Sequence, residues 1–275
     1  VLFEAQQGRV LAVDSAPLPA VKGQRIAVLF SGGPAAGGHN VVAGLFRVLG
    51  EHNTLLGVKS GPKGLLSGDL FEITEAHIDQ ILNLGGFDFL GSDRTKIKTK
   101  EQYEQVRQVV KQHGLTGIII VGGDDSNTNA AFLADFLSSE GCCVVGVPKT
   151  IDGDLQAGAL LPISFGFDTA TKIYSEMVGN ILQDTPSSRK YWHFVKLMGR
   201  SASHVALEVA LQTKPTYTLI SEEIASKKWT LDAIVTQLST VILQRSARGV
   251  NYGVVIVPEG VIEFIPEFKL LIGAL

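Results

Sequence analysis

The stretch Gly117-Ile-Ile-Ile-Val121-Gly122-Gly123-Asp124-Asp125-Ser126-Asn127 places two glycines and two carboxylates directly after an unbroken apolar run. The run predicts a buried strand, and a helix-like pattern follows at residues 128–137. Glycines at a strand exit let backbone N–H groups approach an anion closely. Adjacent carboxylates would repel a bare phosphate, so they indicate a divalent cation between themselves and a polyphosphate. An Asp-rich turn with a helix N-cap at Ser126 or Asn127 explains the same residues, and this stretch alone does not decide between them.

Apolar runs alternate with amphipathic segments on both sides of this stretch. We expect strands at residues 25–30, 55–58, 117–121, 142–147, 192–197, 216–220 and 253–257. Helical patterns lie between them at residues 39–49, 76–84, 100–113, 127–137, 168–183, 201–212 and 231–245. This alternation predicts an α/β fold with buried parallel sheets. Right-handed crossovers then bring the strand ends, with the loops that they carry, to one edge of each sheet.

Two segments interrupt the alternation. Residues 1–24 contain scattered prolines and no sustained period, which is typical of an N-terminal arm. Near residues 156–163 the sequence Gln-Ala-Gly-Ala-Leu-Leu-Pro breaks the rhythm and predicts a domain boundary. We therefore expect one domain at residues 25–160 and a second at residues 161–262.

The composition excludes several classes of protein. The chain has 275 residues, 45% of them hydrophobic and 19% charged, with a formal net charge of −3. This is a globular balance without the basicity that nucleic-acid binding requires, so an anion site must be built locally. No apolar stretch is long enough to span a membrane, and no signal peptide is visible. The only cysteines, Cys142 and Cys143, are adjacent and fit no metal motif, which suits core residues of a cytoplasmic protein.

A glycine-rich loop joins the first central strand to the first helix. It reads Ser31-Gly32-Gly33-Pro34-Ala35-Ala36-Gly37-Gly38-His39-Asn40. Exposed N–H groups and the positive potential of a helix start would favour an anion there. The loop matches neither the dinucleotide pattern nor the Walker pattern. A tight strand–helix turn remains the alternative, although four glycines favour a phosphate loop.

A third polar loop follows the expected strand at 142–147 and reads Pro148-Lys149-Thr150-Ile151-Asp152-Gly153-Asp154-Leu155. Residues two apart in an extended stretch face the same side, so Asp152 and Asp154 could face one cleft roughly 7 Å apart. One carboxylate could accept a proton while the other holds a cation. Lys149 would stabilise charge on a phosphoryl group. A solvated turn with Gly153 at a special backbone angle explains this loop equally well, and the recurrence of polar loops after three apolar strands favours a site.

The second half of the chain offers binding groups near strand ends. Arg189-Lys190-Tyr191 precedes one strand, Met198-Gly199-Arg200-Ser201 follows it, and Glu259 follows another. Basic residues with a carboxylate suit a sugar phosphate, because the cations bind phosphate and the carboxylate binds hydroxyls. Helix caps and surface ion pairs are the alternative. Three histidines form no spaced metal set and are expected to be structural: His39, His193 and His204.

Taken in order, these motifs resemble the phosphofructokinase family from about Arg25 to about Leu270, with the long pyrophosphate-dependent branch as the closer match. The likeness rests on an ordered set of short sequences. They are Gly-Gly-His-Asn at 37–40, Gly-Gly-Phe-Asp at 85–88, Gly-Gly-Asp-Asp-Ser-Asn-Thr-Asn at 122–129, Pro-Lys-Thr-Ile-Asp-Gly-Asp-Leu at 148–155, Ser-Phe-Gly-Phe-Asp-Thr-Ala at 164–170, Leu-Met-Gly-Arg at 197–200 and Val-Pro-Glu-Gly at 257–260.

The resemblance implies two Rossmann-like parallel-sheet domains of the phosphofructokinase fold, with the active site in the cleft between them. It implies reversible transfer of a phosphoryl group from pyrophosphate to the 1-hydroxyl of fructose 6-phosphate in glycolysis. Residues 25–160 would be the domain for pyrophosphate and Mg²⁺, and residues 161–262 the domain for fructose 6-phosphate. Some sugar-phosphate contacts of the family cross a subunit interface, so a homodimer or larger homo-oligomer is implied, with no nucleic-acid or membrane partner.

The resemblance also assigns roles to residues. Gly32, Gly33 and Arg94 match donor-phosphate positions, and Asp124 matches the Mg²⁺ ligand. Asp125 stands where ATP-using relatives have glycine and should repel the α-phosphate of a nucleotide. Lys149 and Asp152 match catalytic positions, Lys149 for the transferring phosphoryl group and Asp152 as general base. The remaining matches are to sugar-phosphate contacts: Thr150, Ile151, Asp152, Asp154, Lys190, Tyr191, Met198, Gly199, Arg200 and Glu259.

The chain departs from the family pattern at several points. Pro34 removes a backbone donor from the first loop, and Asp93 puts an extra carboxylate beside Arg94, so both could weaken pyrophosphate binding. The chain stops where long-branch relatives continue, with residues 263–275 beginning a helical insertion, and lacks a later Tyr-Glu-Gly-Arg motif. We therefore expect a truncated chain that alone is weakly active or inactive.

Two other functions within the family remain open at this stage. An ATP-dependent phosphofructokinase is disfavoured by Asp125 and Lys149. A non-catalytic regulatory subunit is disfavoured because Asp124, Lys149, Asp152 and Arg200 are all retained. Pyrophosphate-dependent phosphotransfer is the leading expectation.

Overall fold

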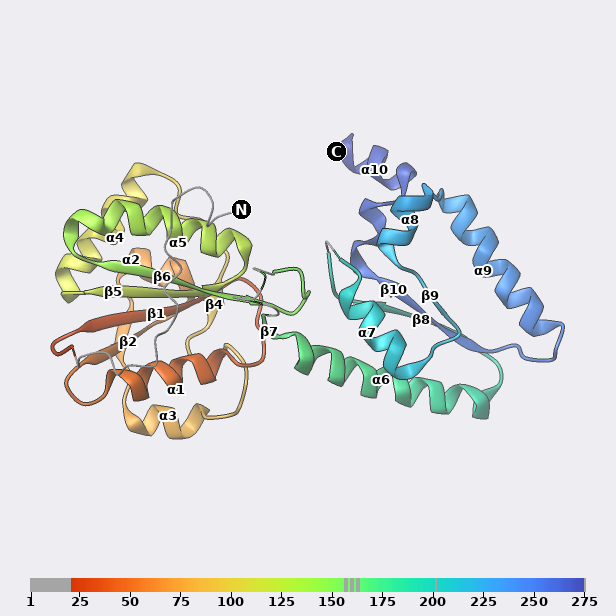
Figure 1. Ribbon diagram of the computed structural model, residues 1–275, viewed down its shortest axis with the longest axis horizontal. Helices are drawn as coiled ribbons and strands as arrows, with labels where there is room; N and C mark the ends of the chain where they lie inside the picture. Colours follow the sequence, from red (N-terminus) through yellow and green to blue (C-terminus); the bar gives the residue numbers. More distant parts are fainter. Residues whose placement is uncertain (1–20, 156–157, 159–160, 162–163, 201, 275) are drawn as a thin grey trace. The chain divides into compact units, whose positions relative to one another are not determined.

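The structure, a computed structural model, describes residues 21–155, 158, 161, 164–200 and 202–274 (Figure 1). The chain divides into two compact units, the first ending at Lys149 and the second beginning at Thr150. Most of residues 156–163, where a boundary was predicted, and most of the predicted N-terminal arm lie outside the described residues.

The first unit is a β-sheet with helices on both faces (Figure 1). Its strands are β1 (Arg25–Ser31), β2 (Thr54–Val58), β3 (Leu70–Glu72), β4 (Ser92–Asp93), β5 (Gly117–Gly122) and β6 (Cys143–Thr150). Its helices are α1 (Gly38–Leu49), α2 (Gly61–Ser67), α3 (Glu75–Ile81), α4 (Lys100–His113) and α5 (Asp124–Leu137), followed by the 3₁₀ turn Ser138–Glu140.

The order of strands in this sheet predicts where a ligand binds. The order is β3-β2-β1-β5-β6, with β4 also paired to β1. Strand β1 pairs in parallel with β2, β4 and β5, and β5 pairs in parallel with β6, whereas β2 and β3 are antiparallel. The chain leaves β1 toward β2 on one side and returns to β5 on the other side. In open α/β sheets such a reversal of strand order is where ligands bind, beside the carboxyl ends of the strands.

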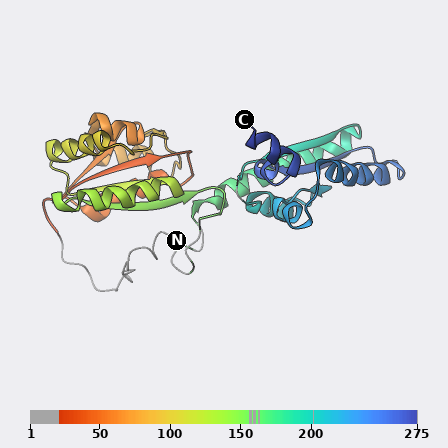
Figure 2. The ribbon, with the colours of Figure 1, turned by 90° about the horizontal axis from the view of Figure 1, so that it is seen from above.

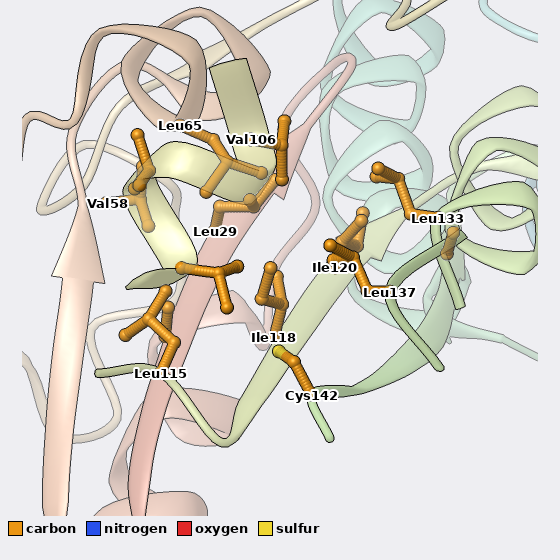
Figure 3. Packing of buried hydrophobic residues seen from close by; sticks show 14 of the residues in the cluster. Leu29, Val58, Leu65, Val106, Leu115, Ile118, Ile120, Leu133, Leu137 and Cys142 are labelled. Atoms are coloured by element: carbon orange, nitrogen blue, oxygen red, sulfur yellow. The ribbon is translucent and has the colours of Figure 1, made fainter. Parts of the chain in front are cut away.

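An apolar core fixes this sheet. Helices α2, α4 and α5 cover one face, where Leu65, Val106 and Leu133 pack on Leu29 and Ile118 of the central strands (Figure 3). Both ribbon views show α5 running alongside the strands (Figures 1 and 2). Helices α1 and α3 lie on the other face (Figure 1). The central strands are therefore buried on both faces, as their unbroken apolar runs predict.

The second unit has a smaller parallel sheet in the order β8-β10-β9. Its strands are β8 (Trp192–Leu197), β9 (Tyr217–Thr218) and β10 (Gly253–Pro258). The two-residue strand β7 (Phe165–Gly166) does not belong to this sheet. Its helices are α6 (Phe167–Ser188), α7 (His204–Thr213), α8 (Ser221–Lys227), α9 (Leu231–Ser246) and α10 (Pro266–Gly273), with a 3₁₀ turn at Glu259–Glu263. One core joins α6 and α7 to the sheet through Val178, Val205, Val209, Val254 and Ile256.

The predicted α/β class with parallel sheets is confirmed, and the differences are local. Helix α5 begins at Asp124 and its N-cap is Gly123, so the alternative considered for this stretch, an N-cap at Ser126 or Asn127, is wrong. Strand β6 does not end at residue 147 as predicted but continues through Pro148 to Thr150. Pro148 is tolerated there because it lies near the strand end, opposite Gly122. Helix α2 was not predicted, since the sequence Gly-Pro-Lys-Gly-Leu-Leu-Ser is short and rich in helix-breaking residues. No helix among the described residues is long and apolar enough to cross a membrane.

Candidate functional site

The carboxyl ends of β1 and β5 lie side by side. The strands are paired up to Phe30 and Val121, and just beyond them the Ser126 hydroxyl donates to the Ser31 hydroxyl at 2.8 Å. A β-carbon at Gly122 would overlap the Ser126 side chain. The structure therefore brings together the polar loops that follow these two strands, at the point where strand order reverses.

Two cationic side chains lie against the glycine pair that follows β1. A β-carbon on Gly32 would lie 3.8 Å from Lys149 Nζ, and a β-carbon on Gly33 would lie 3.7 Å from Arg94 Nη2. Glycine at both positions keeps the backbone open beside these charges, as the close approach of an anion requires. Four of the residues predicted to handle the donor phosphate thus share one location in the first unit.

The Gly32 backbone does not serve the site in the expected way. Its N–H donates to the Asp93 carbonyl at 2.9 Å, and its carbonyl accepts from the Ser92 hydroxyl at 2.8 Å. The expectation that this loop exposes its N–H groups to an anion is therefore wrong for Gly32. What Gly32 offers is a backbone without a side chain, at φ +88°, beside the Lys149 ammonium.

The Lys149 side chain is positioned by a strand and is largely buried. It lies in β6, its exposed fraction is only 8%, and its Nζ lies 5.9 Å from the centroid of the Phe87 ring. A side chain on a strand is positioned more accurately than one on a loop. A largely buried ammonium in a site of low dielectric also acts more strongly on an anion than an exposed one does.

Asp93, expected as an unfavourable carboxylate beside Arg94, has another role. Its Oδ1 accepts from the N–H groups of Lys63 at 3.2 Å and Thr95 at 3.0 Å, and its Oδ2 accepts from the Thr95 hydroxyl at 2.6 Å. These bonds tie the first turn of α2 to the turn that carries Arg94. The Asp93 carboxylate thus stabilises this turn through its hydrogen bonds.

Asp124 and Asp125 occupy the first turn of α5, where negative charge is favoured by the helix dipole. Asp125 forms an ion pair with Lys96, whose Nζ lies 2.6 Å from Asp125 Oδ2; their side chains are 68% and 48% exposed. Asn129 fixes the neighbouring backbone by donating to the Ile97 carbonyl and accepting from its N–H group. The sequence analysis did not identify Lys96 as a partner of Asp125. The only indication in the sequence is its basic character and its position two residues after Arg94.

The residues at this strand end fit Mg²⁺ bound together with a phosphate. Among the described residues no group of three or more His, Cys, Asp or Glu side chains could hold a metal ion by itself. Mg²⁺ is usually bound by one or two carboxylates together with water and phosphate oxygens. The exposed Asp124 carboxylate, beside the loops that would take the phosphate, matches that mode of binding.

The turn after β6 carries Asp152. Ile151, Asp152 and Gly153 form a bend, in which the Asp152 N–H donates to the Thr150 hydroxyl at 3.1 Å and Gly153 adopts φ +72°. The chain is not extended here, so the expectation that Asp152 and Asp154 face the same side loses its basis. The special angle of Gly153, considered as the alternative, is observed.

Met198, Gly199, Arg200 and Glu259 meet at the carboxyl ends of β8 and β10. The strands are paired through Leu197 and Pro258, and the Gly260 N–H donates to the Gly199 carbonyl at 2.9 Å. Glu259 Oε1 lies 3.9 Å from Lys196 Nζ, an ion pair that the sequence did not reveal. Parallel pairing of these strands therefore collects four predicted sugar-phosphate residues at one sheet edge.

Lys190 and Tyr191 lie elsewhere. They precede β8, with Lys190 Nζ 5.6 Å from the centroid of the Tyr191 ring, whereas Met198, Gly199 and Arg200 follow the strand. The six residues of β8 span about 20 Å at 3.3 Å per residue. One copy of this unit thus presents its predicted sugar-phosphate residues at opposite ends of a strand.

Two of the three histidines expected to be structural, His39 and His204, have defined contacts. His39 is 2% exposed, its Nε2 lies 3.3 Å from Asp88 Oδ1, and burial lowers its pKa while the Asp88 charge opposes the shift. His204 lies at the start of α7, where its Nδ1 is 2.9 Å from the Gly153 carbonyl oxygen. Neither belongs to a group of metal ligands among the described residues.

Comparisons with known proteins agree with this fold. A family model described as phosphofructokinase matches residues 25–270. The chain is 54% identical over 256 residues to a pyrophosphate–fructose 6-phosphate 1-phosphotransferase of Entamoeba histolytica, covering 91% of this chain and 47% of that protein. It is 53% identical over 268 residues to a protein of the same name from Treponema pallidum, covering 96% of this chain and 46% of that protein.

A solved structure gives the same result for the fold. A phosphofructokinase from Saccharomyces cerevisiae superposes with a TM-score of 0.74 at 24% identity, covering 92% of this chain and 36% of that one. At this identity the likeness concerns the fold alone. The chain spans about half the length of the curated relatives that it matches.

Proposed function

The chain belongs to the phosphofructokinase family, and from that premise we propose that its protein transfers a phosphoryl group from pyrophosphate to the 1-hydroxyl of fructose 6-phosphate. The product is fructose 1,6-bisphosphate, and the reaction is a reversible step of glycolysis. The names of the relatives from Entamoeba histolytica and Treponema pallidum support this choice of donor and acceptor.

One observation supports the inorganic donor most directly. Lys149 and Arg94 lie against the glycine pair 32–33, at the sheet edge where strand order reverses. Pyrophosphate has no base or ribose, so a protein must recognise it by charge and by close approach of its backbone. A glycine pair between two cations provides both features.

The remaining residues divide the work of phosphoryl transfer, which depends on positioning and charge neutralisation. Lys149 stabilises negative charge on the transferring phosphoryl group. Asp152 accepts the proton of the sugar hydroxyl as general base. Asp124 would hold Mg²⁺, which when bound supplies neutralisation of the pyrophosphate charge. Met198, Gly199, Arg200 and Glu259 bind the sugar phosphate.

A coupled assay tests the donor. The purified protein is supplied with fructose 6-phosphate, Mg²⁺ and either pyrophosphate or ATP, and formation of fructose 1,6-bisphosphate is followed. We expect turnover with pyrophosphate alone when the full-length protein is assayed, whereas the 275-residue chain by itself should be weakly active or inactive. Turnover with ATP alone would contradict the proposal, and turnover with neither donor, while fructose 6-phosphate still binds, would indicate a regulatory subunit.

Asp125 provides a matched pair of variants for this assay. Asp125→Gly removes both the charge and the bulk expected to exclude a nucleotide, so the ratio of ATP to pyrophosphate turnover should rise about tenfold or more. Asp125→Asn keeps the bulk and removes only the charge, and should give a smaller rise. An unchanged ratio in both variants would remove Asp125 from its assigned role.

We also propose that the protein acts as a homodimer or larger homo-oligomer. A second copy supplies Lys190 and Tyr191 to a site whose other sugar-phosphate residues lie at the far end of β8. The separation of these two groups along one strand, about 20 Å, supports a shared site. Two-fold symmetry would make each copy give and receive the same residues.

A cytoplasmic location completes the proposal. Cys142 and Cys143 are both free thiols. Burial, with a smaller contribution from Cys143, raises the pKa of Cys142 to about 11, so this thiol is unreactive at neutral pH. Free thiols of this kind suit the reducing conditions of the cytoplasm.

A further inference from the structure

The turn that carries Asp152 is anchored on both sides of that residue. Before it, the buried Ser164 hydroxyl donates to the Thr150 carbonyl at 2.8 Å. After it, His204 Nδ1 lies 2.9 Å from the Gly153 carbonyl oxygen. A carbonyl oxygen can only accept, so Nδ1 must carry the proton and donate. The imidazole therefore carries a proton on Nδ1, which it donates to the Gly153 carbonyl oxygen.

Gly153 fits closely between two helix starts. A β-carbon at this position would lie 2.9 Å from Phe167, the first residue of α6, and 3.3 Å from the His204 Nδ1. The backbone is also in the left-handed region, at φ +72°. A larger residue would have to push one of these rings away, so the peptide after Asp152 has little room to shift.

Ser203, the residue before His204, belongs to a polar network that links two helix starts. The N–H group of Ser203 donates to Glu222 Oε1 at 2.9 Å, and the Ser203 hydroxyl accepts from the Ser221 N–H at 2.8 Å. Both serines are at most 3% exposed. Burial raises the pKa of Glu222, but hydrogen bonds from backbone N–H groups and the nearby His204 outweigh it, so the pKa is lowered. The start of α7 is thereby anchored to the start of α8.

We propose that His204 is a positioning residue, which holds the Gly153 carbonyl so that the Asp152 carboxylate stays aligned with the sugar hydroxyl. This rests on the proposed function of Asp152 as general base. His204 does not touch the reacting atoms; it acts through the Gly153 peptide. A small misplacement of a catalytic group can lower turnover by about 10²-fold. Loss of the hydrogen bond from His204 to the Gly153 carbonyl should therefore lower turnover.

Two variants test the contact in the coupled assay. His204→Leu removes the donor, whereas His204→Asn places an amide N–H near the position of Nδ1. We expect His204→Leu to lower kcat with pyrophosphate by about 10–10²-fold while KM for fructose 6-phosphate stays within about twofold. His204→Asn should recover turnover to within about threefold of the natural protein. Equal loss in both variants, or no loss in His204→Leu, would overturn the proposal.

A second measurement tests the positioning role of His204 without an activity assay. Hydrogen exchange at the Asp152 amide, which donates within the same turn, should be about 3–10-fold faster in His204→Leu, as for loss of one hydrogen bond. It should be near the natural rate in His204→Asn. A protein that turns over with neither donor would defeat the proposed function, whereas unchanged exchange in His204→Leu would defeat the positioning role.

Discussion

The two units organise their predicted ligand residues in different ways. In the first unit the ends of β1, β5 and β6, with the turn after β4, bring Gly32, Gly33, Arg94 and Lys149 to one sheet edge. In the second unit the predicted sugar-phosphate residues lie at both ends of β8. Under the proposed function, the first unit assembles its donor site from one copy of the chain, whereas the second unit would share its sugar-phosphate site with another copy.

The difference follows from the direction of the strands. The carboxyl ends of parallel strands, with the loops that follow them, lie at one edge of a sheet. Gly32, Gly33 and Arg94 follow such strands and Lys149 lies near the end of one, so all four are at the same edge. Lys190 and Tyr191 precede their strand, so the same rule places them at the opposite edge. For Lys190 and Tyr191 we therefore propose that they serve the sugar-phosphate site of another copy of the chain.

The largest expected effect concerns the general base. Asp152→Asn should lower turnover with pyrophosphate by about 10²–10⁴-fold, because a positioned general base contributes that much. Affinity for fructose 6-phosphate should change little. Steady-state kinetics and equilibrium binding of the sugar phosphate separate the two quantities. The control is Asp154→Asn, which changes an exposed carboxylate two residues on and should cause a smaller loss; unchanged turnover in Asp152→Asn would remove the base from its role.

The next prediction concerns recognition of pyrophosphate by charge in the first unit. Lys149→Met should lower kcat with pyrophosphate by about 10²–10³-fold, the loss typical of a preorganised donor to a developing negative charge. Binding of pyrophosphate should weaken less than turnover does. Lys96→Met is the comparison, since Lys96 is half exposed and paired with Asp125, and exposed ion pairs contribute little. Equal losses in the two variants would mean that burial of Lys149 gives it no special role.

A mixing experiment tests the shared sugar site. Asp152→Asn and Lys190→Ala should each be strongly impaired, the second through loss of a phosphate contact. When they are mixed and allowed to reassociate, half of the dimers contain one intact site, so about one quarter of the natural activity should return. Assays before and after subunit exchange measure this.

The control mixture pairs Asp152→Asn with Arg200→Ala. Arg200 follows β8, on the segment that leads into α7 and its contact with Gly153, so both changes affect the same copy's share of the site. No activity should return on mixing. Recovery in this mixture, or none in the first, would contradict the division of β8 between two sites.

The smallest effect concerns the strand ends of the first unit. Ser126→Ala leaves the buried Ser31 hydroxyl without its partner and should lower the free energy of opening by about 1–2 kcal/mol. Native-state hydrogen exchange of the β1 and β5 amides measures this for the unit by itself. Ser226→Ala, which removes an exposed bond on α8, should change it by less than about 0.5 kcal/mol. Equal effects would show that the strand ends are not tied by this bond.

The sequence predicts the fold well where local signals and burial agree. Helix α4 was predicted at its observed bounds, because Thr99 caps its start and Gly114 takes the left-handed angle at its end. The start of α5 was placed too late, since Gly-Gly-Asp-Asp is also the composition of a turn. The short helix α8 was missed, because seven residues carry too little periodicity to detect.

The site was predictable in its residue types and less so in its contacts. The resemblance identified Asp124, Lys149 and Asp152, but the expected geometry of Asp152 and Asp154 assumed an extended chain that the structure lacks. The partners Lys96 and Lys196 are ordinary surface lysines in the sequence, and only folding brings them to Asp125 and Glu259. Long-range pairing of this kind has no local signature.

A crystal structure of the protein with Mg²⁺ and pyrophosphate tests the central claim most directly. We expect pyrophosphate beside Gly32 and Gly33, with its oxygens bound by Arg94 and Lys149 and with Mg²⁺ bound by Asp124. Pyrophosphate bound away from the ends of β1 and β5, or Asp124 turned away from a bound donor, would contradict it.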